Sequence, residues 1–139
     1  MASEDVGMAY PSAISIVTAC VQASQMVGLP EAAINLSQAV ILLASAPKSN
    51  ASYMAYNAAM EDLHRRQIDD VPPHLKDSHY SGAAKLGFGQ SYKYPHAYGG
   101  YVKQQYLPDN LYKEGVKYYK PTENGSEASF KKYLEGLEK

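Results

Sequence analysis

The sequence predicts a mainly α-helical fold: a compact array of helices, an irregular second half rich in tyrosine, glycine and proline, and a C-terminal helix. Two observations support this prediction. Apolar residues in the first 60 positions recur at helical spacing, and only four charged side chains interrupt them, Glu4, Asp5, Glu31 and Lys48. No stretch of the chain alternates apolar and polar residues for long enough to predict more than a short pair of strands.

The chain is predicted to form one domain over residues 1–139. It is 45% apolar and 19% charged, a composition that can bury one hydrophobic core. Within the domain, residues 1–66 form the predicted helical core, residues 67–125 the irregular segment and residues 126–139 the terminal helix. The net charge of −1 predicts no strong general attraction to nucleic acid or acidic lipid.

The first helix is predicted to begin at Pro11-Ser12 and to end near Gly28, because serine and proline are typical of helix starts and glycine of helix ends. Cys20 lies among uncharged residues of this helix. We interpret it as an inert core residue, and a single cysteine excludes a disulfide within the chain.

The second helix is predicted to begin at Leu29-Pro30-Glu31 and to end at Pro47. No charged side chain lies between Ala32 and Pro47, and the apolar residues form two stripes roughly 100° apart around the axis. A helix that is apolar on more than one side is normally buried on more than one side, so one side is expected to contact a partner chain. The candidate interface residues are Ala33, Ile34, Leu36, Val40 and Ile41.

Two further helices follow from cap and charge signals. Ser49 or Asn50 is expected to cap a third helix that ends near Arg65 and Arg66, whose charges suit a helix C-terminus. An amphipathic last helix is expected from Ser126 to Leu137, and short helices are expected at residues 79–86 and 107–112.

No catalytic or cofactor-binding motif is found in the sequence. The phosphate-binding pattern G-x-x-x-x-G-K-[ST] does not occur, so the chain is predicted to be no enzyme and to hold no cofactor. Gly87-Phe88-Gly89 begins a dinucleotide-like pattern that lacks its third glycine, and we interpret it as a turn. The four histidines lack metal-ligand spacing, so no metal site is predicted.

The sequence indicates a cytoplasmic protein. The N-terminal residues Met1-Ala2-Ser3-Glu4-Asp5 lack the basic and apolar regions of a signal peptide. Polar side chains recur through the uncharged residues 6–30, so no membrane span is expected.

Residues 76–120 contain seven lysines and nine of the thirteen tyrosines. Two interpretations remain open: the tyrosines pack inward while the lysines keep the surface soluble, or the two residue types bind single-stranded DNA. Because the chain is near neutral, such binding is expected to be weak or absent. The candidate DNA contacts are Lys93, Tyr94, Lys103, Tyr106, Lys117 and Tyr118.

Five groups of residues, in order along the chain, carry a resemblance to a known family. They are Ala2-Ser3-Glu4-Asp5-Val6-Gly7 with Pro11; Ala46-Pro47-Lys48-Ser49-Asn50; Val71-Pro72 with His74-Leu75; Gly87-Phe88-Gly89-Gln90 with Tyr92 and Tyr94; and Tyr118-Tyr119-Lys120-Pro121-Thr122. Together they resemble the C-terminal domain of the replication-associated recombination protein A family, also called MgsA, which includes the Werner helicase-interacting protein. One departure is Tyr10, since members commonly have an acid before the proline.

This resemblance implies a collar-like homotetramerisation domain of a clamp-loader-like AAA+ ATPase. The ATPase and lid domains, with ATP and Mg²⁺, would precede this chain and act with it in cis. The parent would act in DNA replication, recombination and repair at stalled forks, associated with the nucleoid, with DNA and single-strand-binding protein as partners. The alternative hypothesis is a single-stranded-DNA-binding or protein-docking module of the same ATPase.

Overall fold

The computed structural model describes residues 1–79 and 82–137, with the backbone alone for Ala84, and within these ranges it contains helices and no strand. The mainly α prediction is confirmed. The α-helices are α1 (Ala13–Val27), α2 (Ala32–Ser45), α3 (Ala51–Arg65), α4 (Asp109–Lys113) and α5 (Glu127–Leu137). Short π- or 3₁₀-helical turns cover Ala2–Val6, Gly7–Ala9, Pro73–Leu75, Ala83–Leu86 and Pro95–Tyr98.

The chain folds into two compact units. The first comprises residues 1–59 and 118–139, so the C-terminal helix belongs with the N-terminal helices, and the second comprises residues 60–117. Whether the two units act as one domain stays a prediction.

Helix boundaries agree closely with the local signals in the sequence. Gly28 ends α1 with a φ of 73°, and its N–H donates to the Ser24 carbonyl at 3.1 Å. Of the two cap candidates for α3, Ser49 provides the bond: its Oγ accepts the N–H of Ala51 at 3.1 Å. Ser12 precedes α1 without a side-chain cap bond.

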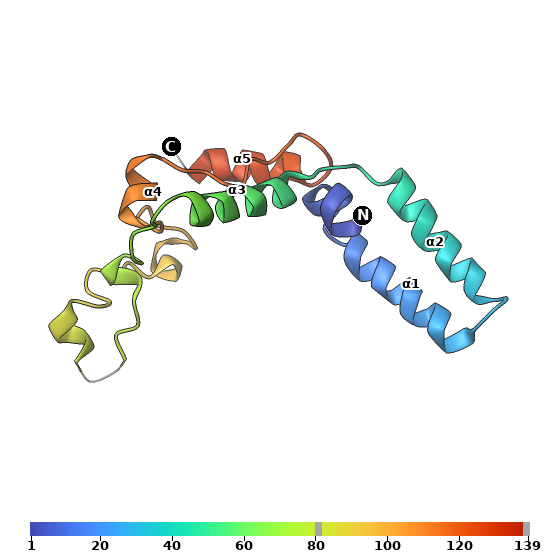
Figure 1. The fold of residues 1–139 in the computed structure, drawn as a ribbon, viewed down its shortest axis with the longest axis horizontal. Coiled ribbons are helices and arrows are strands. Elements are labelled where there is room, and N and C mark those ends of the chain that lie inside the picture. The colour runs from blue at the N-terminus through green and yellow to red at the C-terminus, as the bar shows by residue number, and fades with distance from the viewer. Residues whose placement is uncertain (80–81, 138–139) are drawn as a thin grey trace. The chain divides into compact units, whose positions relative to one another are not determined.

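Helices α1 and α2 pack side by side as an antiparallel hairpin (Figure 1). The buried residues of this pair are small, which lets the two backbones approach closely. Ser24 Oγ donates to the Cys20 carbonyl at 2.8 Å, so its polar group is satisfied inside the contact. Cys20 is only 6% exposed, which confirms its predicted place in the core. The buried residues are Ala13, Cys20 and Ser24 of α1 and Ala32 and Ala39 of α2.

The base of the hairpin is held by backbone contacts to the segment before α5. The N–H of Ser126 donates to the Ala9 carbonyl at 2.8 Å. Gly125, at a φ of +52°, lies so close that a Cβ there would stand 2.1 Å from the same Ala9 oxygen. Only glycine fits this approach, because a side chain would collide with backbone that cannot move aside.

The second unit is joined largely by polar contacts. Arg66 pairs with Asp62 at 2.7 Å and with Glu114 at 2.5 Å. The Asn110 side chain accepts the N–H of Asp69 at 3.3 Å and donates to the Gln67 carbonyl at 3.0 Å, which ties α4 to residues 67–69. Gly87 and Gly89 lie in turns with positive φ, so the turn interpretation of that glycine pattern is confirmed. Of the predicted helix at residues 79–86, the described part forms the turn Ala83–Leu86.

Candidate oligomer interface

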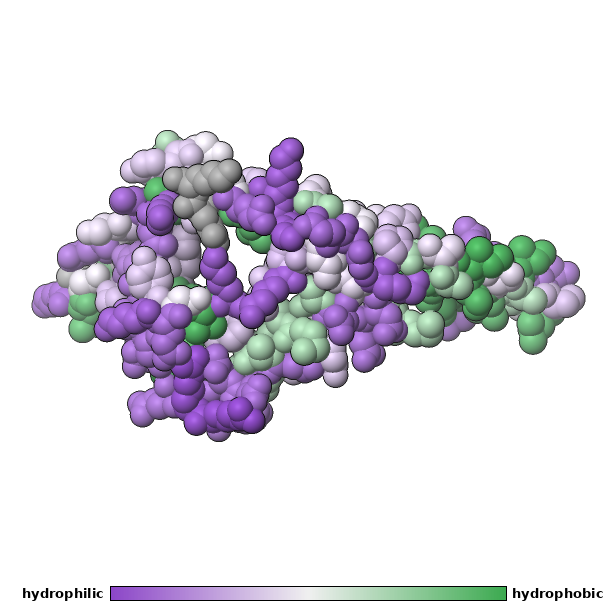
Figure 2. Space-filling view, turned by 90° about the horizontal axis from the view of Figure 1, so that it is seen from above, coloured by the Kyte–Doolittle hydropathy of each residue, from purple (hydrophilic) through white to green (hydrophobic). Residues whose placement is uncertain are grey.

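The outer face of the α1–α2 hairpin is apolar and exposed. On α2, Ile34 is 73% exposed, Val40 65%, Ile41 63% and Leu36 43%, and Ala33 is also exposed. All five residues predicted as an interface therefore lie at the surface of the single chain. In the space-filling view, strongly hydrophobic residues gather over this hairpin (Figure 2). The hairpin also exposes apolar residues of α1 and of the loop after it: Ile14, Val21, Met26, Val27 and Leu29.

The exposure of these residues follows from how α2 meets α1. The buried residues of α2 are Ala32 and Ala39, which lie seven residues apart and so form one line along the helix. Neither of the two predicted apolar stripes coincides with this buried line. Both stripes consequently point away from the core of their own chain. A contiguous exposed apolar surface of this kind is typical of a site that binds another protein.

The exposed apolar face carries almost no charge. Glu31 is the only charged residue between Val6 and Pro47, so the hairpin presents no pattern of charge that would select a charged partner. An uncharged apolar surface is best matched by another apolar surface, and a second copy of the same face is the simplest such match.

A buried glutamate holds together the segments from which the hairpin extends. Glu127, the first residue of α5, is fully buried, and its Oε2 accepts the backbone N–H of Thr122 at 2.9 Å and the Thr122 hydroxyl at 2.7 Å. Its Oε1 accepts a hydrogen bond from the Tyr119 hydroxyl at 3.0 Å, and the Ser49 hydroxyl also donates to the Glu127 carboxylate. Ser49 in turn donates its backbone N–H to the Asp5 carbonyl at 2.8 Å. Four donors thus converge on one carboxylate.

These donors determine the charge state of Glu127. Burial raises the pKa of this carboxyl, but the hydrogen bonds from Thr122, Ser49 and Tyr119 outweigh burial, so the net pKa lies below the usual value. Burial, together with the bond to the carboxylate, raises the pKa of Tyr119 to about 12. The network is therefore built for an ionised glutamate and a neutral tyrosine. Sequence reasoning did not single out Glu127, because an acid in the first turn of a helix is usually an exposed partner of the helix dipole.

Residues 1–138 match the protein family described as MgsA AAA+ ATPase C terminal. The chain belongs to this family.

Curated relatives agree with that membership. This family member is 47% identical over 141 residues to replication-associated recombination protein A of Bacillus subtilis, covering 100% of this chain and 33% of the relative. It is 49% identical over 138 residues to an uncharacterised AAA domain-containing protein of Mycobacterium tuberculosis, covering 99% of this chain and 30% of that protein. Identity to replication-associated recombination protein A of Escherichia coli K12 is 37% over 141 residues, covering 99% of this chain and 31% of the relative. The chain spans about a third of the length of each of these three relatives.

The structure brings together four of the six candidate DNA contacts of this family member. The Gln104 side chain accepts the N–H of Lys93 at 3.1 Å and donates to the Lys93 carbonyl at 2.8 Å. Lys93 and Tyr94 therefore lie beside the segment that carries Lys103 and Tyr106. Of the other two candidates, Lys117 is the last residue of the second unit and Tyr118 belongs to the first.

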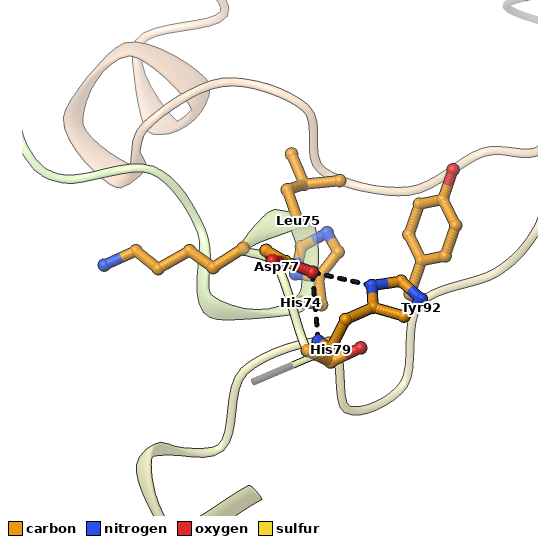
Figure 3. Close-up of a pocket in the computed structure, with 8 residues that line it drawn as sticks. His74, Leu75, Asp77, His79 and Tyr92 are labelled. Carbon is orange, nitrogen blue, oxygen red and sulfur yellow. Dashed lines mark hydrogen bonds and ion pairs between the residues drawn. The ribbon is translucent and has the colours of Figure 1, made fainter. Parts of the chain in front are cut away.

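A shallow pocket of about 310 Å³ also lies in the second unit of this family member (Figure 3). His79 donates its backbone N–H to Asp77 at 3.0 Å, and its Nδ1 lies 2.7 Å from the same carboxylate oxygen. His74 Nε2 lies 2.8 Å from the Gln105 carbonyl, on another segment.

The described residues contain no group of three histidine, cysteine, aspartate or glutamate side chains placed to hold a metal ion. Among them, no helix is long and apolar enough to cross a membrane.

Proposed function

We propose that this chain joins copies of a AAA+ ATPase into a homotetramer through the outer face of the α1–α2 hairpin, and that it catalyses no reaction itself. The observation that supports the proposal is the exposed, uncharged apolar face on α2. Burying one side chain of leucine or isoleucine size contributes roughly 1.5–3 kcal/mol, so several of them per chain are enough to support a stable contact.

The two stripes of α2 favour a tetramer over a dimer. Ile34 and Ile41 lie on one side of the helix, and Leu36 and Val40 lie on another, and all four are exposed. Each side can form its own two-fold contact with a copy of itself. Two different two-fold contacts per chain close into an assembly of four.

We propose that the parent protein acts in DNA replication, recombination and repair, since relatives carry replication-associated recombination in their names. In this proposal the preceding AAA+ and lid domains hold ATP and Mg²⁺ and act in cis with this chain. The tetramer would place several such domains around DNA at stalled forks, with single-strand-binding protein as a further partner and the cytoplasmic nucleoid as the setting.

The test of assembly is multi-angle light scattering on the 139-residue chain. We expect the mass of four chains at micromolar concentration. A monomer at all accessible concentrations would contradict the proposal.

A second expected result is that the chain binds no ATP. None of its sequence motifs forms a phosphate-binding loop, a Mg²⁺ ligand set or an adenine pocket. Titration calorimetry with Mg-ATP should give no heat of binding beyond dilution. Binding in the micromolar range would show that the chain contains nucleotide-binding elements of its own.

A further inference from the structure

One long segment of the second unit contains no acidic residue. Residues 78–108 include Lys85, Lys93 and Lys103 and six tyrosines, and the nearest acids in sequence are Asp77 and Asp109. The whole chain has a net charge of −1, so this local excess of positive charge is hidden in the total. The segment itself is therefore cationic although the protein is nearly neutral; Asp109, next to it in sequence, accepts a hydrogen bond from the Gln105 side chain at 2.7 Å.

The acids elsewhere in the unit are largely occupied. Glu61 pairs with Arg65, and Asp70 pairs with Lys76. Asp62 and Glu114 both pair with Arg66. No ion pair within the described ranges includes Lys93 or Lys103, and both lysines are exposed. Their charges are consequently available to a ligand.

Gln104 brings the two lysines to one place. Its side-chain amide makes both hydrogen bonds to the backbone of Lys93, and its Nε2 also lies 3.2 Å from the Tyr106 hydroxyl. Residues 92–94 and 103–106 are thus adjacent segments, and each lysine is at most one residue from the contact. This arrangement orders a stretch that has no helix or strand of its own.

The aromatic rings of the same segments are exposed. Tyr94 is 60% exposed, Tyr92 44% and Tyr106 42%. The Tyr106 ring is held in place because its hydroxyl donates to the Val102 carbonyl at 2.9 Å. The Tyr94 and His96 rings lie 5.1 Å apart. The interpretation that these tyrosines pack inward is therefore wrong for Tyr92, Tyr94 and Tyr106.

We propose that the surface formed by Tyr92, Lys93, Tyr94, Lys103 and Tyr106 binds single-stranded nucleic acid, with bases stacked on the rings and phosphates at the lysines. Exposed aromatic faces beside unpaired cations are the two components of such sites. A duplex keeps the faces of its bases stacked inside, and an acidic peptide would engage the lysines but not the rings. The proposal goes beyond the oligomer interface, since these residues lie in the second unit and α1 and α2 lie in the first.

The test is fluorescence anisotropy of labelled oligodeoxyuridylate and oligouridylate, which carry the same base on different sugars, with the 139-residue chain at several salt concentrations. We expect weak binding, with a dissociation constant of roughly 10⁻⁴–10⁻⁶ M at physiological salt. With two phosphates neutralised, log K should fall by roughly 1.4 per log unit of salt, and Lys93→Gln or Lys103→Gln should each reduce that slope by about 0.7. Equal affinity for both oligonucleotides supports recognition of bases and phosphates alone, and a preference identifies the sugar that the site favours.

Tyr94→Ala separates stacking from charge. It should weaken binding roughly 5- to 150-fold without changing the salt slope, and Tyr94→Phe, which keeps the ring, should bind like the parent. Tyr112→Ala and Lys113→Gln are matched controls in α4, outside the acid-free segment, and should leave binding unchanged.

Three outcomes would overturn the proposal: no binding at low salt, equal losses in the α4 controls, or full binding by Tyr94→Ala. Efficient competition by polyglutamate with no effect of Tyr94→Ala would point to an acidic protein as the ligand. The Ile34→Asp variant, designed to block assembly, should still bind once per chain. Loss of binding in that variant would show that the site is not contained in one chain.

Discussion

The variants Ile34→Asp and Ile41→Asp should convert the proposed tetramer into smaller species while leaving the single chain folded. Ile34 is 73% and Ile41 63% exposed in the chain by itself, so an aspartate there stays in water until the chains associate. On assembly the carboxylate would be buried without a partner, which costs several kcal/mol, and the contribution of the isoleucine, roughly 1.5–3 kcal/mol, would be lost. The same change is repeated in all four copies.

Light scattering and circular dichroism measured together check this result. We expect a fall in mass at micromolar concentration with the helical signal retained. Leu63→Asp on α3 is the matched control, because Leu63 is 59% exposed but lies outside the α1–α2 hairpin. Tetramers of full stability in both isoleucine variants would place the interface elsewhere, and equal dissociation by Leu63→Asp would indicate a non-specific effect of charge.

Glu127→Ala should strongly destabilise the first unit. Glu127 is fully buried and accepts hydrogen bonds from Thr122, Tyr119 and Ser49, so its removal leaves the buried Ser49 and the half-buried Thr122 and Tyr119 without this acceptor. We expect a loss of about 1–3 kcal/mol in the free energy of unfolding, the cost of leaving buried hydrogen-bond donors without an acceptor. Denaturant unfolding at a fixed chain concentration measures it, since the stability of an oligomer depends on concentration.

The pH dependence of this loss tests whether the carboxylate is ionised. The pKa of Glu127 in the folded chain lies below the value of about 4.3 for an unfolded glutamate. Its ionised form therefore adds stability that is fully present above the unfolded pKa and is lost as pH falls through the folded pKa. The difference in stability between the parent and Glu127→Gln should shrink below about pH 4.3. Glu135→Ala, an exposed change in the same helix, should stay within about 0.5 kcal/mol of the parent, and a similar loss there would refute the role assigned to Glu127.

The sequence alone predicted the order of the helices. Gly28, Pro47 and Ser49 are local signals that act through backbone geometry and nearby hydrogen bonds, so they need no knowledge of the rest of the fold. The absence of charge from Ala32 to Pro47 is also readable directly, and it was enough to single out α2 as a helix with more than one apolar side. The family was recognised from short residue groups spread along the chain, and the match over residues 1–138 confirms it.

Only the tertiary structure decided which residues are buried. Periodicity favours large apolar residues as the core, yet the buried apolar residues of α1 and α2 are the small Ala13, Cys20, Ala32 and Ala39, and small side chains permit closer contact between helices. The larger apolar residues of α2, such as Ile34 and Ile41, are exposed instead. The apolar pattern alone does not distinguish residues that face the core of their own chain from residues that face a partner. Glu127 is the clearest case: Ser49, one of its donors, is 78 positions away in sequence. Whether a charged side chain is exposed or buried depends on donors that only the folded chain brings within reach, and no local pattern records them.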